Sequence, residues 1–233
     1  MTPPIIHRVT ALDLPVRPTP WPFAQVRRAE IDAHFAEKQR EKPNIWNGRV
    51  LLGRNPSFTE TRLSADYFET DFASFLAWRD WGFPDRDVFN GFGVGALRSS
   101  DGAFLLGEMA PHTSNAGRIY FPSGTPDLDD IRDGKVDIAG SVVREVFEET
   151  GLTEADYAAE AYWDCVVTDA SIGIFRLLRV DMPGEALRAR IEANLARQRH
   201  PELCAIHLMR GPRDFTATMP RFVTAYIEAK LLA

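Results

Sequence analysis

A segment near residue 150 carries three glutamates at the spacing of one helical face. Residues 144–152 read Arg-Glu-Val-Phe-Glu-Glu-Thr-Gly-Leu, so Glu145, Glu148 and Glu149 stand at positions i, i+3 and i+4 and would lie side by side on a helix. Carboxylates this close repel one another and destabilise an isolated helix by roughly a few tenths of a kcal/mol for each pair. A hard divalent cation such as Mg²⁺, which prefers oxygen ligands, would offset that repulsion.

The same helix has an apolar side and recognisable ends. We expect it to run from about residue 138 to residue 150, with Asp137 as the N-cap and Gly151 as the residue after the last turn. Four side chains point away from the glutamates and are expected to anchor the helix to a core: Val142, Val143, Val146 and Phe147. The helix should therefore separate an acidic face from a buried one.

Clustered glutamates are most often a solvated helix face, but this string is more specific. Every fixed position from Arg144 to Leu152 matches the second half of the Nudix box, Arg-Glu-U-x-Glu-Glu-x-Gly-U, in which U is aliphatic. A hairpin signal and the segment Phe121-Pro122-Ser123-Gly124 precede it in the expected order. The chain therefore resembles the Nudix hydrolase superfamily.

The first half of the box departs from the family's pattern. Val136 stands where the pattern has a glutamate, eight positions before the box arginine, and Asp130 stands where it has a glycine. Gly124 is the plausible glycine, and the loop over residues 125–134 would then carry about six extra residues. We expect Asp137 to replace the missing glutamate, one position late.

The resemblance implies a fold and a chemistry. Nudix proteins are α/β/α sandwiches with a mixed sheet, and their enzymes use Mg²⁺ or Mn²⁺ to hydrolyse a nucleoside diphosphate linked to a further group X. The resemblance assigns the metal to Glu145, Glu148 and Glu149. It implies that Arg144 orients these carboxylates and that Glu145 is either a ligand or the general base, alternatives that the sequence leaves open. Gly124 and Gly151 would shape the backbone of the box.

Many family members use one more acidic residue outside the box. Glu202 is the first candidate for this catalytic role, because it precedes the apolar strand expected over residues 203–209 and would project back toward the helix. An ordinary solvent-exposed loop glutamate is the alternative. Asp164 and Asp169 are weaker candidates for the same role.

Substrate contacts are expected in the loop region immediately before the box. This region concentrates hydrogen-bond donors and aromatic side chains, as small-molecule sites do. His112, Asn115 and Arg118 are the candidates for holding phosphate or sugar, although each is also an ordinary loop residue. Tyr120 and Phe121 are expected in the core rather than stacked on a base.

The chain before the box is long, and part of it resembles one branch of the family. Residues 47–49 ahead of a strand, residues 75–79 in an aromatic helix and residues 90–94 are similar to the front of Nudix proteins that split UDP-glucose and UDP-galactose. This resemblance implies a UDP-sugar as substrate, giving UMP and a sugar 1-phosphate. ADP-ribose, a dinucleoside polyphosphate and coenzyme A are alternative substrates. A Nudix-fold module that binds a nucleotide without cleaving it is the alternative of a different class.

Proline positions and periodicity divide the chain into elements and two parts. Six of the sixteen prolines fall in residues 1–22, which we expect to run extended over the surface. The pattern predicts helices over 26–42, 67–81, 138–150, 184–199 and 220–232, and strands over 49–53, 92–97, 103–107, 161–167, 172–180 and 203–209. We expect an N-terminal arm and α/β extension over 1–87 and a Nudix domain over 88–233, and an arm of this length could exchange between the subunits of a homodimer.

Composition limits the partners and the compartment. A formal net charge of −6 gives no sign of a basic surface for nucleic acid or membranes. Cys165 and Cys204 lack the spacing of zinc ligands or of a disulfide framework, and we expect both to be buried free thiols. The N-terminal residues lack the apolar stretch of a signal peptide. We therefore expect a small-molecule substrate and a cytoplasmic protein.

Overall fold

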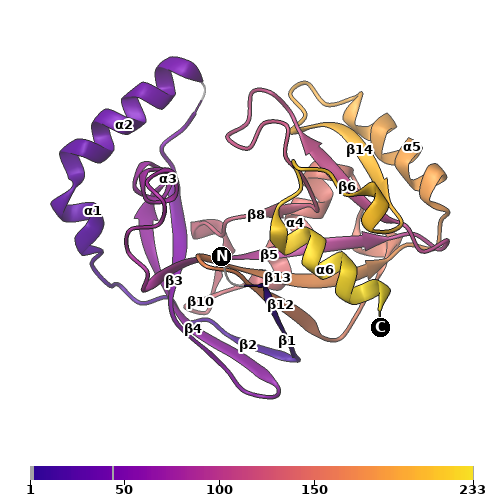
Figure 1. Cartoon of the computed structure of the whole chain (residues 1–233), viewed down its shortest axis with the longest axis horizontal. Coiled ribbons are helices and arrows are strands. Elements are labelled where there is room, and N and C mark those ends of the chain that lie inside the picture. Colours follow the sequence, from indigo (N-terminus) through magenta and orange to yellow (C-terminus); the bar gives the residue numbers. More distant parts are fainter. Residues whose placement is uncertain (1–2, 44, 233) are drawn as a thin grey trace.

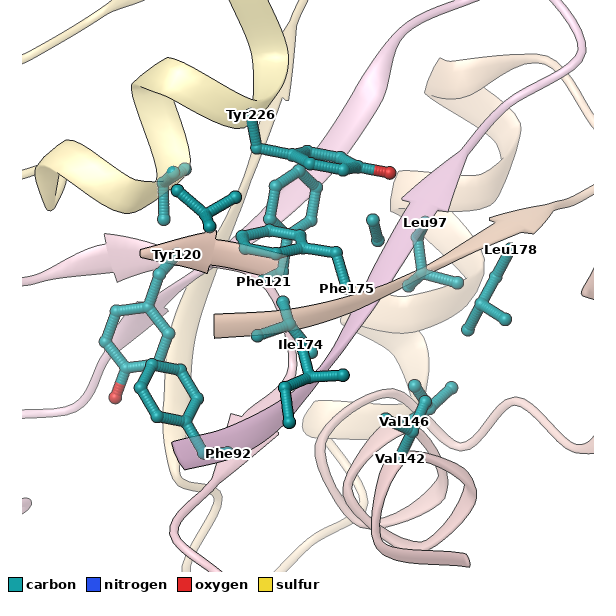
Figure 2. Packing of buried hydrophobic residues seen from close by; sticks show 14 of the residues in the cluster. Phe92, Leu97, Tyr120, Phe121, Val142, Val146, Ile174, Phe175, Leu178 and Tyr226 are labelled. Carbon is teal, nitrogen blue, oxygen red and sulfur yellow. The ribbon is translucent and has the colours of Figure 1, made fainter. Parts of the chain in front are cut away.

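A mixed sheet between helices forms the centre of the computed structural model, which describes residues 3–43 and 45–232 (Figure 1). Strands β5 (Val88–Arg98) and β13 (Ser171–Arg179) lie at its middle and pair in parallel along the whole length of β13. Helix α4 (Ile138–Thr150) packs on one face of this pair, and α6 (Arg221–Leu231) packs on the other (Figure 2). The expected α/β sandwich with a mixed sheet is confirmed.

Helix α4 can lie close to the sheet because β5 is rich in glycine. A Cβ atom on Gly95 would stand 2.3 Å from a methyl carbon of Val146, and one on Gly93 would stand 2.7 Å from a methyl carbon of Val142. Both valines are buried. Because protein interiors are close-packed, a side chain at either glycine would push α4 outward. The two glycines therefore set the distance between the acidic helix and the sheet.

Aromatic rings join α6 to the opposite face of the sheet. Phe175 of β13 stacks on Tyr226 of α6 with ring centroids 4.1 Å apart. Phe121 meets both rings edge to face, as Figure 2 shows. Tyr120 and Phe121 are both buried, which confirms the prediction that they belong to the core. The chain just before the box is thereby fixed between the two helices.

Strands β5 and β6 do not form the expected hairpin beyond its turn. β6 (Phe104–Met109) meets β5 only at the pair Arg98–Phe104 and otherwise pairs with β14 (Leu203–Met209) and with the short strand β7 (Ile119–Tyr120). The prediction fails because the edges of β5 are taken by β13 on one side and by β3 (Arg49–Phe58) and β8 (Ser123–Gly124) on the other. Strand β14 has the predicted bounds, and it brings the chain after α5 back toward the box.

The extension adds strands and helices that continue this sheet (Figure 1). Strands β3 and β4 (Arg62–Asp71) are antiparallel, and β3 also pairs with β5 through Gly53 and Phe89. Helices α2 (Arg28–Glu41) and α3 (Phe72–Asp80) pack against each other beside these strands, after the short helix α1 (Pro22–Val26). The helix predicted over 26–42 is confirmed as α2, and the strand predicted over 49–53 continues to residue 58.

The helix predicted over 67–81 is wrong in its first part. Tyr67 lies in β4, where it shares a buried face with Leu63 and Ala65 at the period of two that a strand has. Helix α3 begins only after Asp71, whose carboxylate accepts a hydrogen bond from the backbone N–H of Ser74 at 2.8 Å. No polar turn separates the end of β4 from the start of α3, and aromatic residues occur in both. The sequence pattern therefore predicts one continuous helix over a segment that forms a strand and then a helix.

The proline-rich N-terminal arm forms two edge strands. Strand β1 (Ile5–Val9) pairs with β12 (Trp163–Val167), and β2 (Ala11–Asp13) pairs with β4, at opposite ends of the strand order. Edge positions suit a segment in which prolines remove backbone donors. Asp164 of β12 is 3% exposed and forms ion pairs with Arg8 and Lys230. Both oxygens of Asp164 are therefore engaged by cationic side chains away from the box, and the prediction that Asp164 could act as the additional acidic residue is wrong.

The remaining elements are short or lie at the periphery. Helix α5 (Gly184–Leu195) ends before the predicted residue 199. The loop regions contain short strands at Ile119–Tyr120 (β7), Ile131–Arg132 (β9), Lys135–Val136 (β10) and Ala158–Ala159 (β11), and single 3₁₀ turns at Leu128–Asp130, Glu154–Asp156 and Pro212–Asp214. In the part of the chain that the structure describes, no helix is both long and apolar enough to cross a membrane.

Two predictions about burial are wrong in part. Val142 and Val146 anchor α4 as expected, but Phe147 is 54% exposed and Val143 is only half-buried. Helix α4 therefore contacts the sheet along a narrower stripe than the sequence suggested. Both cysteines are free, as predicted, yet only Cys165 is buried, whereas Cys204 is exposed on β14.

Candidate active site

A cavity of about 660 Å³ lies between the extension and the core. Its size falls within the range of small-molecule sites, about 300–1,000 Å³. The core side contributes the box residues Arg144, Glu145 and Glu148 and the loop residue Glu202. The extension contributes a mostly apolar wall from α3 and the chain between α2 and β3. The cavity therefore brings the acidic face of α4 opposite residues that lie far away in the sequence.

Glu145 is held in the cavity wall against Gly124 of β8. Its side chain is only 14% exposed, and a Cβ atom on Gly124 would stand 2.4 Å from one of its carboxylate oxygens. Burial raises the pKa of Glu145 to about 7, with Arg144 opposing this shift and the charges of Glu148 and Glu202 adding to it. A carboxyl group that titrates near neutral pH is suited to transferring a proton.

Glu149 lies one turn further along α4 and is 4% exposed. Its Oε1 accepts a long hydrogen bond of 3.4 Å from the backbone N–H of Ser123, while its Oε2 has no hydrogen-bond partner among the described residues. Burial raises the pKa of Glu149 well above its usual value, and the charges of Glu145 and Glu202 raise it further. A buried carboxylate oxygen without a partner is costly, which points to a proton or a cation at this position.

Glu148 and Glu202 complete the acidic cluster on its solvent side. Both are exposed and line the cavity. Glu202 directly precedes β14, where its backbone carbonyl accepts a hydrogen bond of 2.8 Å from the N–H of Ala110. The structure thus places Glu202 beside the box. Asp169, the weaker candidate, lines a separate hollow of about 200 Å³.

The acidic cluster fits a divalent cation in the type of its donors. Among residues 3–43 and 45–232, no group of three or more histidine, cysteine, aspartate or glutamate side chains is arranged to hold a metal ion. The cluster nevertheless supplies carboxylate oxygens, an unpartnered Oε2 on Glu149 and a mutual repulsion that a cation would offset. Binding would require the carboxylates of Glu145, Glu148 and Glu149 to rotate toward a common centre.

Arg144 is anchored by Asp130 rather than by Asp137. One guanidinium nitrogen of Arg144 lies 2.9 and 2.8 Å from the two carboxylate oxygens of Asp130, which is 4% exposed. The same nitrogen lies 3.5 Å from Glu145. The prediction that Asp137 replaces the missing glutamate is wrong, because its carboxylate caps α4 by accepting a 3.0 Å hydrogen bond from the N–H of Gly140. Sequence reasoning missed Asp130 because the inserted loop that carries it has no counterpart in the family pattern.

Replacing Asp130 with asparagine is expected to destabilise the protein, because one of the two oxygens that accept hydrogen bonds from Arg144 and from the backbone N–H of Asp127 becomes an NH₂ group that faces these donors. An unmade buried hydrogen bond costs about 1–3 kcal/mol. Burial raises the pKa of Asp130, so removal of its charge offsets part of this cost, and we expect a net loss of about 1 kcal/mol. Asp137→Asn is the matched control, since asparagine caps a helix about as well as aspartate does. Chemical denaturation would measure both variants, and equal losses of unfolding free energy would contradict the assignment of Asp130.

The loop residues expected to touch substrate all line the cavity: His112, Asn115 and Arg118. Asn115 links the core side of the cavity to the extension. The Nδ2 of Asn115 donates to the hydroxyl of Tyr120 at 3.2 Å, and the Oδ1 of Asn115 accepts from Arg79 of α3 at 3.4 Å. Lys42, just after α2, donates to the backbone carbonyl of Thr113. The loop between β6 and β7 is thereby tied to the extension.

The cavity residues that sequence reasoning missed come mainly from the extension and β5. Phe72, Phe75 and Arg79 stand on one face of α3, at a spacing typical of a helix that packs on a core. Asn90 of β5 begins one of the segments similar to UDP-sugar-splitting proteins, but nothing in the sequence marks it as a cavity residue, and Trp46 has no sequence signal at all. The pairing of β3 with β5 brings the side chains of the extension to the acidic cluster.

Comparisons with known proteins identify similar structures but no close relative. No family model matches the chain, and no curated protein matches it. Similar solved structures include a Nudix hydrolase from M. smegmatis, at 14% identity over 62% of this chain and 88% of that one, with a TM-score of 0.40. A MutT protein from Methanosarcina mazei Go1 is 19% identical over 60% of this chain and 90% of that one, with a TM-score of 0.38.

A third similar structure is a bifunctional NMN adenylyltransferase/ADP ribose pyrophosphatase from Francisella tularensis, at 15% identity over 68% of this chain and 44% of that one, with a TM-score of 0.40. All three likenesses are distant. One of them carries the name Nudix hydrolase, the family whose box pattern residues 144–152 match. The likeness of this chain to the Nudix hydrolases therefore rests on its box sequence.

Proposed function

We propose that this protein is a divalent-metal-dependent Nudix pyrophosphohydrolase that cleaves the diphosphate linkage of a nucleoside diphosphate derivative. One observation carries the proposal. Glu145 and Glu149 are desolvated on α4, next to Glu148 and Glu202 and beside a cavity large enough for a nucleotide derivative. An acidic helix face with a purely structural role would be solvated, whereas carboxyl groups with strongly raised pKa values are typical of functional sites.

Each acidic residue has a role in this proposal. When bound, Mg²⁺ or Mn²⁺ would neutralise the diphosphate and lower the pKa of the attacking water. Glu148 and Glu149 supply carboxylates that hold the ion. Glu145, with a pKa of about 7, either accepts a proton from the water or adds a third ligand, and Glu202 can serve the same two purposes. Arg144 lies close enough to orient the carboxylate of Glu145.

The proposed reaction is a hydrolysis at phosphorus. The water oxygen forms a bond to one phosphorus atom of the diphosphate, and the bond from that atom to the bridging oxygen breaks. The bridging oxygen leaves with the other phosphate, and the proton of the water passes to the general base. Two phosphate monoesters result, without any redox change.

Among nucleoside diphosphate derivatives we propose a UDP-sugar, cleaved to UMP and a sugar 1-phosphate. The support is the resemblance of residues 47–49, 75–79 and 90–94 to UDP-sugar-splitting proteins, because Phe75, Arg79 and Asn90 from these segments line the cavity. We also propose that residues 1–87 act as a substrate-shaping extension of a domain over 88–233. The loop residues described above supply donors for phosphate or sugar oxygens.

A substrate panel tests the reaction and the substrate separately. With Mg²⁺ or Mn²⁺, the protein is expected to release UMP from UDP-glucose or UDP-galactose faster than it cleaves ADP-ribose, a dinucleoside polyphosphate or coenzyme A, as measured by chromatography of the products. Faster cleavage of one of these other compounds would identify that compound, rather than a UDP-sugar, as the preferred substrate. If no diphosphate is cleaved with either metal, the enzymatic proposal fails and a nucleotide-binding module takes its place.

Compartment and assembly are proposed on simpler grounds. Cys165 and Cys204 are both free thiols, which supports a reducing compartment such as the cytoplasm. The acidic net charge of −6 supports a small-molecule substrate rather than a nucleic acid or a membrane. A homodimer formed by exchange of the N-terminal arm would be detected by light scattering of the purified protein.

A further inference from the structure

Part of the cavity wall is aromatic and lies apart in sequence from the acidic cluster. Phe72 and Phe75 of α3 line it from the extension, and Phe92 of β5 and Phe222 of α6 line it from the core. The smaller hollow of about 200 Å³ shares Phe222 with this cavity, and it also shares Phe83. The two hollows are therefore lined in part by the same aromatic side chains. A diphosphate and its metal need no aromatic wall, so this region must contact some other part of the substrate.

Trp46 supplies an exposed ring at this wall. It lies in the chain between α2 and β3 and is 81% exposed, although an exposed tryptophan is unusual unless it contacts a partner. Its ring lies over Gly48, since a Cβ atom there would stand 2.4 Å from a ring carbon. Glycine at this position gives the indole a flat support, and the rest of the ring remains available to a ligand.

Phe83 stands at the wall in a strained conformation. Its φ of 60° lies in the left-handed region, which is rare for a bulky side chain. The conformation is held by a hydrogen bond of 2.8 Å from its N–H to the carbonyl of Trp78 and by an edge-to-face contact with the Trp78 ring at 4.8 Å. Strain of this kind is retained where the position of a side chain matters for function.

Asn90 places an unsatisfied acceptor at the same wall. Its Nδ2 donates to the hydroxyl of Thr125 at 3.1 Å. Its Oδ1 is buried and has no hydrogen-bond partner among the described residues. Asn90 lines the cavity together with Phe92 and with Ser171, its neighbour on β13. The oxygen itself has almost no contact with solvent. Because buried acceptors are normally paired, a rotation of the Asn90 side chain toward the cavity would let this oxygen receive an N–H group from a ligand.

We propose that this wall is the binding site for the base of the nucleotide, and that Asn90 Oδ1 accepts a hydrogen bond from an N–H on the edge of that base. The inference rests on the proposed function, whose substrate it deepens. A nucleobase matches the wall because it has apolar faces that stack on aromatic rings and a polar edge that carries N–H donors. A sugar can also lay its C–H face on an aromatic ring, so the polar edge of the base and the binding test below, which compares ligands with and without a base, distinguish the two.

Binding of nucleoside monophosphates without metal tests this site apart from hydrolysis. Isothermal titration calorimetry with UMP, AMP and ribose 5-phosphate compares ligands that share a phosphate but differ in the base. At least one nucleotide is expected to bind about tenfold or more tightly than ribose 5-phosphate, given the usual contribution of base stacking. Equal affinity for all three ligands would overturn the proposal.

Variants at the wall make the test specific. Trp46→Ala is expected to weaken nucleotide binding about tenfold while leaving ribose 5-phosphate binding unchanged, and Trp46→Phe, which keeps an aromatic face, should recover most of the affinity. The ring is so exposed that its removal should not unfold the protein. Nucleotide affinity that is unchanged in Trp46→Ala would contradict the stacking role.

Methylation of the base tests Asn90. The wild-type protein is expected to bind N3-methyl-UMP about tenfold more weakly than UMP, whereas Asn90→Leu should bind the two equally weakly. Thermal unfolding shows whether Asn90→Leu remains folded. If it does and still discriminates as the wild type does, Asn90 does not contact the base. A failure of all diphosphates to be hydrolysed, by contrast, would count against the proposed reaction and would leave these binding results intact.

Discussion

Replacing Glu149 with glutamine is expected to lower metal-dependent hydrolysis by a factor of about 10²–10⁴ and, at the same time, to stabilise the metal-free protein. The rate falls because the acidic cluster loses a carboxylate, and losing a catalytic group has effects of about this size. Stability rises because burial raises the pKa of Glu149 well above its usual value, so its ionisation opposes folding near neutral pH. The new amide can still accept the hydrogen bond from Ser123.

Glu148→Gln is the matched control for this prediction. Glu148 lies on the same face of α4 but is exposed, so its replacement should lower the rate but raise stability much less, through relief of repulsion alone. Turnover with Mg²⁺ and thermal unfolding in a chelator would measure the two effects. Equal stability changes in both variants would show that burial of Glu149 is not the cause. Full activity of Glu149→Gln would remove Glu149 from the site.

The local structure around the box could be predicted from the sequence because short-range rules determine it. The end of α4 follows from Gly151, which adopts a positive φ of 74°, and its start follows from the cap at Asp137. Strand β14 could be predicted because turn residues bound an apolar run. In each case neighbours within a few residues decide the outcome.

The composition of the cavity could not be predicted, because it depends on contacts between distant segments. Phe75 reads as an ordinary apolar helix residue until β3 pairs with β5 and brings α3 to the cavity. Asp130 was noted only as a departure from the family pattern, yet it lies 2.8 Å from Arg144 across fourteen residues. Family patterns describe positions along the chain, and an insertion changes which residue reaches a given point in space.

The extension and the core depend on each other at this cavity. Asn115 in the core loop contacts Arg79 of the extension, and Lys42 contacts the same loop at Thr113. The acidic cluster supplies chemistry that is common to any diphosphate, so discrimination between substrates must come from the rest of the wall. Changes in the extension should therefore alter which diphosphate is used more than how it is cleaved.

The stability of the metal-free protein is expected to fall between pH 5 and pH 8, and Glu145→Gln should reduce this fall. The pKa of Glu145 rises from 4.5 to about 7 in the folded protein. The folded state therefore holds its proton to higher pH than the unfolded state does. The stabilising contribution is complete below pH 4.5 and is lost as pH rises through 7. Because the side chain is only 14% exposed, the loss is about 3 kcal/mol.

Mg²⁺ or Mn²⁺ should reverse this fall, since protons and cations compete for the same carboxylates. At pH 8 either ion is expected to raise the melting temperature, by an amount that grows with its concentration. At pH 5, where Glu145 is protonated, the same concentration should have little effect. In Glu145→Gln, the fall of stability with rising pH and the metal-induced rise in melting temperature should both be smaller. A metal-induced rise of equal size at both pH values would show that the ion binds elsewhere, because only ligands that titrate in this range couple metal binding to pH.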